Sequence, residues 1–270
     1  MPDSDGYSVL DVATPRTRWG TTIVAVHSDM RSMIVEQQES EHTIDLAFDE
    51  QPLKVRIAKR DSHRGAASLL ISKMYSWRGY ESMPLRPDPN RLTLVASEPK
   101  RHVGTISIGF DSPTGLLVDD LYKPEVDALR GKGARVCETI KLAVDKKARS
   151  KRVLSSLFHI VVIYAYRIRR ATDMVIEVNP RHVTYYEEMF GFRQLGSERL
   201  NHRVSAPAVL LGVELDRFHN DIRAFGGKPR SQAFPKSLYP YFFPPEEEEG
   251  IVQRLACSAT TTLSHAISAG

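Results

Sequence analysis

Segments with the spacing of strands and segments with the spacing of helices follow one another from about Lys54 to Asp216, and their order limits the fold most. "VRIA" has the composition of a short strand, and Asp61 then caps a segment with apolar residues at helical spacing. Alternation with a period of two marks further strands at 91–97, 102–111, 134–145, 173–179 and 206–215. Helical patterns separate the last three of these strands. The order β, α, β, β, β, α, β, α, β predicts an α/β fold with a mixed central sheet flanked by helices on both faces.

The segments outside this order predict the domain organisation. Residues 1–53 lack sustained periodicity, so we expect a partly ordered N-terminal leader before a domain at 54–216. Within that domain, the polar segment 119–133 is interpreted as a connection between strands. Residues 217–270 are rich in proline and aromatic residues and then acidic, which indicates a C-terminal extension on or beside the domain.

Composition and cysteine use bound the class of protein. With 41% hydrophobic and 26% charged residues in 270, the chain has the make-up of a soluble globular protein. Only Cys137 and Cys257 are present, far apart, so neither a disulfide framework nor a zinc site is expected. The N-terminus does not resemble a signal peptide, and the apolar run 153–168 is too short for a membrane span. These features favour a cytoplasmic protein without a metal, in which 153–168 is a buried helix.

One carboxylate interrupts an apolar strand. A period of two places Glu138 on one face with Val136, Ile140, Leu142 and Val144. Burying a carboxylate among apolar neighbours costs several kcal/mol unless it is paired or its proton affinity changes, and both occur at acid/base sites. We therefore expect Glu138 to act as a general base; the alternative is a structural Glu at a bulge or an edge, or one held by an arginine.

Positive charges gather between this strand and the helix that follows it. Only one acidic residue, Asp145, lies among them, although the net charge of the whole chain is only +4. The six cations are Lys141, Lys146, Lys147, Arg149, Lys151 and Arg152. Backbone amides at a helix N-terminus favour a phosphate, and side-chain cations strengthen that field. The segment predicts binding of a phosphate-bearing ligand or an acidic protein, although a solvated basic loop is the simpler alternative. No DNA- or RNA-binding motif accompanies it, so nucleic acid is not expected as a partner.

Two adjacent tyrosines follow the strand 173–179 in "IEVNPRHVTYYEEMFGF". They fall on the first turns of a helix that starts at Pro180, beyond the strand end where ligands of open α/β sheets bind. A phenol there could protonate a leaving thiolate, whereas a tyrosine pair that only packs is the structural alternative.

The element order, the "VNPRHVTYYEEMFGF" segment and the "CETIKLAVD" strand together resemble the long-chain N-acyl amino acid synthases. These belong to the GCN5-related N-acetyltransferase (GNAT) superfamily and are akin to the acyl-homoserine-lactone synthases. The resemblance covers about Lys54 to Asp216 and implies a GNAT-like sheet and transfer of a fatty acyl group from acyl carrier protein to an amino acid, with no bound cofactor or metal. It also implies catalysis by Glu138 and Tyr186, and donor or carrier-protein binding by the six cations and Asn179.

Departures from related patterns favour this reading over two alternatives. Lys141 stands where the lactone synthases carry an arginine, which argues against a lactone-forming signal synthase. The segment after the strand has no glycine to admit the pyrophosphate of CoA, which argues against acetyl-CoA-dependent N-acetylation. A carrier protein presents a single phosphodiester on phosphopantetheine and an acidic surface, which suits the basic segment better than acyl-CoA. A fatty acylated product would also allow peripheral membrane contact, and a non-catalytic basic adaptor is the alternative from another class.

Overall fold

The computed structural model describes residues 22–26, 53–59, 61–76, 80, 84–145, 151–228 and 237–267, without the side chains of 22–26 and 257–267. The strands are β1 Thr22–Val26, β2 Leu53–Ile57, β3 Arg91–Glu98, β4 Arg101–Phe110, β5 Val136–Val144, β6 Asp173–Val178, β7 Arg193–Gln194, β8 Arg199–Asn201 and β9 Ala206–Glu214. The α-helices are α1 Asp61–Ser76, α2 Asp119–Arg130, α3 Lys151–Val162, α4 Val183–Phe190, α5 Leu215–Phe225 and α6 Pro245–Ile267.

The strands form one open sheet in the order β1-β2-β3-β4-β5-β6-β9-β7, with β8 on β9. Of the pairs that build it, β5 and β6 are parallel and the others antiparallel. The parallel pair is joined through α3, as a parallel connection requires. The predicted mixed sheet is therefore confirmed.

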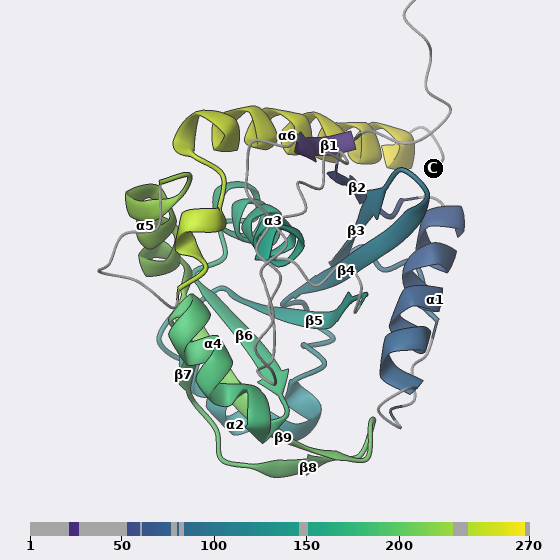
Figure 1. Cartoon of the computed structure of the whole chain (residues 1–270). Helices are drawn as coiled ribbons and strands as arrows, with labels where there is room; N and C mark the ends of the chain where they lie inside the picture. The colour runs from purple at the N-terminus through teal and green to yellow at the C-terminus, as the bar shows by residue number, and fades with distance from the viewer. Residues whose placement is uncertain are drawn as a thin grey trace, which may run out of the picture.

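Helices cover both faces of the sheet, as predicted. On one face α3, α5 and α6 share a large hydrophobic cluster with the central strands. On the other face α1 and α2 cover separate smaller clusters. In Figure 1, α1 lies at the right and α2 at the bottom, while α3 lies beneath α6 at the top.

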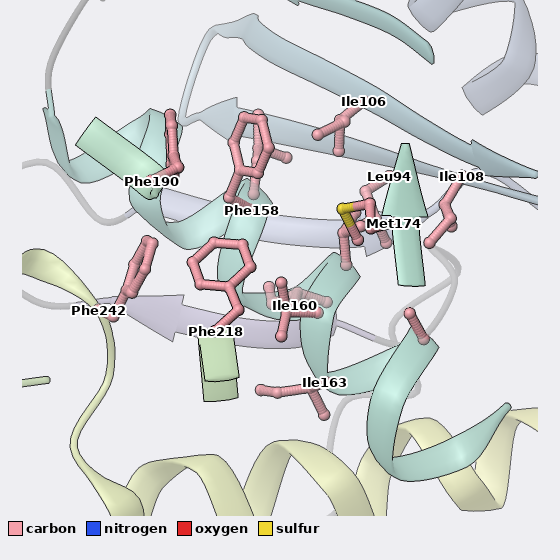
Figure 2. Packing of buried hydrophobic residues seen from close by; sticks show 14 of the residues in the cluster. Leu94, Ile106, Ile108, Phe158, Ile160, Ile163, Met174, Phe190, Phe218 and Phe242 are labelled. Atoms are coloured by element: carbon pink, nitrogen blue, oxygen red, sulfur yellow. The ribbon is translucent and has the colours of Figure 1, made fainter. Parts of the chain in front are cut away.

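Aromatic side chains fill the core on the α3 face. Figure 2 shows Phe158, Phe190, Phe218 and Phe242 turned toward one another, and the ring centroids of Phe158 and Phe190 are 4.3 Å apart. Phe218 and Phe242 lie after Asp216, and both are fully buried. The described part of the C-terminal segment thus completes the core of the domain, because burial of such rings is a main source of folding free energy.

The segment 119–133 is not a connection, and that prediction was wrong. It contains α2, which places acidic residues in its first turn and Arg130 in its last, in accord with the helix dipole. Tyr122 and Val126, one helical turn apart, are its buried residues. Leu129 packs beside them, so a helical spacing is present, but the charged residues around it and the internal Pro124 give the segment the composition of a polar connection.

The apolar run 153–168 is a buried helix, as predicted. It begins in α3 and continues as a π-helix at Ile163–Ile168. Among the described residues, no helix has both the length and the apolar character needed to cross a membrane.

Candidate active site

A β-bulge in β5 shapes the centre of the sheet. Between the pairs Ser107–Ile140 and Thr105–Ala143, β5 contains two residues where β4 contains one. Lys141, one of the two, has a φ of 54°, a conformation typical of bulges and costly for a residue with a side chain. The extra residue shifts the alternation of side chains along β5.

This bulge corrects the prediction that five residues of β5 share one face. Val136 packs in the cluster beneath α2, on the face of Glu138. Beyond the bulge, Leu142 and Val144 pack against the cluster beneath α3 instead. The period of two predicts the wrong face for them because a one-residue insertion exchanges the two sides of a strand.

The parallel strands β5 and β6 separate beside the bulge. Their pairing runs from Val136 opposite Asp173 to Thr139 opposite Ile176. β5 nevertheless continues to Val144, and β6 continues in partnership with β9 to Val178. Beyond Thr139 and Ile176 the facing edges of the two strands are therefore not paired with each other, and we call the space between these edges the opening.

Glu138 lies on β5 just before the strands separate, on the α2 face, and is 3% exposed. Its Oε1 accepts a hydrogen bond from the amide of Leu117 at 3.0 Å, and its Oε2 accepts one from the amide of Val118 at 2.9 Å. These amides immediately precede α2. Burial raises the pKa of Glu138, while the two amides and the charges of Arg91 and Arg203 oppose that rise. The carboxylate therefore fixes the N-terminal end of α2 to the sheet.

Glu177 on β6 is a second carboxylate on this face, partly buried, and it was not among the predicted site residues. Its Oε2 accepts hydrogen bonds from Asn201 at 3.1 Å and from Arg203. Its Oε1 is buried and has no hydrogen-bond partner in the described part of the chain. Burial raises the pKa of Glu177 to about 7, opposed by Arg203 and reinforced by the charge of Glu138. Its position two residues after buried Val175, in an apolar strand, is the same signal that marked Glu138.

We call the sheet surface between the α1 and α2 clusters the polar strip. Register places its members on neighbouring strands of one face: Arg91 and Thr93 on β3, Ser107 and Gly109 on β4, Glu138 on β5 and Glu177 on β6. The hydroxyls of Thr93 and Ser107 lie 2.7 Å apart. The Nε of Arg91 is buried without a hydrogen-bond partner among the described residues. The polar strip thus combines carboxylates that can accept a proton with a guanidinium that can bind an anion.

The two tyrosines lie on the opposite face of the sheet from Glu138. A 3-10 turn at Pro180–His182 leads into α4, and both phenol rings are half-buried. The ring of Tyr186 stacks on Phe190 at 5.7 Å and contacts Phe158 at 6.3 Å between centroids. Burial raises the pKa of Tyr185 to about 12, so that phenol is neutral at physiological pH. The predicted role of Tyr186 as an acid remains a prediction.

The predicted binding residues divide into described and undescribed groups. Lys146, Lys147 and Arg149 lie outside the described residues. Lys151 and Arg152 begin α3, where the Nζ of Lys151 lies 5.1 Å from the centroid of the Tyr241 ring and Arg152 is buried.

Lys141 and Asn179 have local structural surroundings. Burial and the nearby charge of Arg91 lower the pKa of Lys141. Asn179 accepts a hydrogen bond from the amide of Arg181 at 3.3 Å and so caps the 3-10 turn. The described residues contain no group of three or more His, Cys, Asp or Glu side chains placed to hold a metal ion.

The family model of the N-acyl amino acid synthase FeeM matches residues 66–214. The chain belongs to the FeeM family of N-acyl amino acid synthases. The structure of FeeM, an N-acyl amino acid synthase from uncultured soil microbes, matches with 27% identity and a TM-score of 0.57, over 62% of this chain and 94% of FeeM.

Two further solved structures match less well. The AHL synthase LasI shares 15% identity over 60% of this chain and 90% of its own, with a TM-score of 0.45. An acyl-CoA N-acyltransferase from Pseudomonas aeruginosa shares 14% identity over 60% of this chain and 98% of its own, with a TM-score of 0.42. No curated protein matches in sequence. The FeeM-family chain has the predicted GNAT-type fold and is an N-acyltransferase.

Proposed function

We propose that this enzyme transfers a long-chain fatty acyl group from the thioester of an acyl carrier protein to the amine of an amino acid. The observation that carries the proposal is the opening between β5 and β6 beside the polar strip, which holds the buried Glu138 and the partly buried Glu177. The opening offers backbone donors to a thioester, and the carboxylates offer a base to an amine. The family name, N-acyl amino acid synthase, supports an amino acid as acceptor.

The thioester would lie in the opening, with its carbonyl oxygen near backbone amides of β5 beyond Thr139. Such donors stabilise the negative charge that develops on the oxygen when an amine attacks. The amine must be neutral to attack, so Glu138 or Glu177 takes its proton. Tyr186, on the other side of the opening, is the proposed donor of a proton to the leaving sulfur.

Arg91 supports an amino acid as acceptor. Its charge acts on Glu138, and its buried Nε lacks a hydrogen-bond partner among the described residues. A guanidinium forms strong, directional bonds with a carboxylate, which an amino acid carries beside its amine. Arg91 and the two glutamates would then hold opposite ends of the same small molecule.

The basic segment supports a carrier protein as donor. Lys151 and Arg152 stand at the start of α3, directly after Lys146, Lys147 and Arg149 in the sequence. Cations beside a helix N-terminus favour both a phosphodiester and an acidic partner.

Mass spectrometry of lipid extracts from cells that express the protein tests the proposal, because one new mass reports acyl group and acceptor together. The matched culture expresses a variant with both Glu138→Gln and Glu177→Gln. We expect N-acyl amino acids in the first culture and not in the second. Equal lipid profiles in the two cultures would contradict the proposal.

A further inference from the structure

We propose that Glu177, rather than Glu138, takes the proton from the ammonium group of the acceptor, and that Glu138 is a positioning residue that holds α2. This inference rests on the proposed acyl transfer. It follows from the different hydrogen bonds of the two carboxylates and from their positions along the separating strands.

Both carboxylate oxygens of Glu138 already accept structural hydrogen bonds. Each of its oxygens accepts a backbone amide, from Leu117 and from Val118, at 3.0 and 2.9 Å. Neutralising this buried carboxylate would weaken both bonds, since an ionised acceptor forms the stronger ones. Proton uptake by Glu138 would therefore loosen the end of α2 in every catalytic cycle.

Glu177 has an oxygen available. Asn201 and Arg203 both bind its Oε2, whereas its Oε1 is buried and has no hydrogen-bond partner in the described residues. A buried acceptor without a donor is costly, and an ammonium group would satisfy it. Arg203 and Asn201 also fix the side chain, so the free oxygen keeps one orientation.

Position along the strand also favours Glu177. The pairing of β5 with β6 ends at Ile176, and Glu177 is the next residue. Glu138 lies one pair earlier, where the strands are still bonded to each other. An amine that attacks a thioester in the opening would therefore meet Glu177 first.

The charges that face Glu177 come from three elements. Arg203, after β8, lowers its pKa, whereas Glu138 on β5 and Asp120 on α2 raise it, in addition to the larger effect of burial. Tyr122 on α2 also feels the charge of Glu177. A base that gains its proton near neutrality suits general-base catalysis at physiological pH.

In the proposed transfer, the bonds and protons change in two stages. A proton passes from the acceptor's ammonium to Glu177 Oε1, and the nitrogen lone pair forms a C–N bond with the thioester carbonyl carbon. The C–S bond then breaks, and the sulfur leaves with the bonding electrons and takes up one proton. The nitrogen loses a second proton, which balances the proton taken up by the sulfur. The products are an amide and a thiol, and Glu177 releases its proton to water.

The test compares kcat/KM across pH for wild type, Glu177→Gln, Glu138→Gln and the control Glu198→Gln, with acyl carrier protein as donor and the amino acid accepted by wild type. Glu198 is an exposed glutamate outside the polar strip. We expect Glu177→Gln to lose about 10²- to 10⁴-fold and the inflection near its pKa of about 7. Glu138→Gln should melt at a lower temperature and keep an inflection that moves to lower pH, because the charge of Glu138 helps to raise the pKa of Glu177. Glu198→Gln should behave like wild type.

A second acceptor separates chemistry from folding. Hydroxylamine has a nitrogen that is already neutral at pH 7, so its attack does not need the first proton transfer. Glu177→Gln should therefore lose much less activity toward hydroxylamine than toward the amino acid. Glu177→Asp, which keeps a carboxylate, should retain the inflection at a lower rate.

Three results would overturn the inference: wild-type turnover in Glu177→Gln, loss of the inflection in Glu138→Gln alone, or equal losses toward both acceptors in Glu177→Gln. If wild type forms no amide with any amino acid, the proposed acyl transfer itself is wrong, and the role of Glu177 is wrong with it.

Discussion

Gly109 on β4 lies directly opposite Glu138 on β5, so close that a Cβ on Gly109 would stand 2.9 Å from Glu138 Oε1. The carboxylate cannot swing away without breaking its bonds to the amides before α2. Gly109→Ala should therefore lower the free energy of unfolding by about 1–3 kcal/mol, the usual cost of such losses. Urea unfolding of the variant and of wild type measures this difference in free energy.

Gly65→Ala is the matched control for this substitution. Gly65 lies within α1, and a Cβ added there would meet no atom within 4 Å, so alanine should be neutral or stabilising by about 0.5–1 kcal/mol. A Gly109→Ala variant as stable as wild type would show that Glu138 does not fix α2.

Arg91→Met tests recognition of the acceptor's carboxylate. Loss of a charge-assisted bond of about 1.5–3 kcal/mol should raise the KM for an amino acid about 10- to 100-fold. The KM for the corresponding amine without a carboxylate should stay the same. Arg86→Met, at an exposed position, is the control. Equal effects on both acceptors would remove Arg91 from carboxylate recognition.

The tyrosine pair on α4 gives a prediction about proton donation. Tyr186→Phe should lower kcat more than Tyr185→Phe does. If Tyr186 protonates the sulfur, the loss should be about 10²-fold or more. Both variants keep the aromatic ring, so the contacts with Phe158 and Phe190 are preserved. Single-turnover kinetics with a carrier-protein thioester measure the step. Equal small losses would indicate that both tyrosines only pack.

A buried cluster beneath α6 predicts acid sensitivity of the fold. Burial lowers the pKa of His159, and its neighbour Glu248 has a pKa lowered by His159, His219 and Arg167 despite burial. For both groups, the unfolded chain binds a proton more readily than the folded chain does. The two groups therefore stabilise the fold above their unfolded pKa values, about 6.5 for His and 4.3 for Glu, and this stability is lost as pH falls. Tm should fall between pH 7 and 4.

His159→Gln should flatten the part of this dependence that lies near pH 6, while His202→Gln, at an exposed position, should leave it unchanged. Differential scanning calorimetry across pH checks both variants. A Tm that rises as pH falls would contradict the assignment of the cluster.

The fold was largely predictable because strand and helix periods differ clearly in most segments. The helix α2 was missed because its many charged residues and the internal Pro124 were given more weight than the helical spacing of Tyr122, Val126 and Leu129. The bulge at Lys141 was missed because no glycine or other turn-forming residue in this strand indicates a left-handed backbone conformation.

The candidate site was predictable only in part. Glu138 stands out in the sequence as a lone carboxylate in an apolar strand, and Glu177 carries the same signal. What distinguishes them comes from distant segments: Leu117 and Val118 bind Glu138, and Arg203, 26 residues after Glu177, binds Glu177. Such tertiary partners cannot be inferred from local spacing.

The basic segment predicts which donor is preferred. Lys147→Glu with Arg149→Glu should raise the KM for acyl carrier protein and leave a small acyl-thioester donor of the same chain length, which carries no phosphate, nearly unaffected. The effect should shrink as salt shortens the Debye length from about 10 Å at 0.1 M to about 3 Å at 1 M. Lys100→Glu with Lys132→Glu makes the same charge change at exposed sites elsewhere.

The most direct measurement is the initial rate of amide formation by the purified protein with a long-chain acyl carrier protein and the protein amino acids, followed by mass spectrometry. Acyl transfer to an amino acid predicts an N-acyl amino acid and free carrier-protein thiol in equal amounts, formed faster than from the matching acyl-CoA. Thiol release without an N-acyl amino acid, or product from acetyl-CoA alone, would contradict the account.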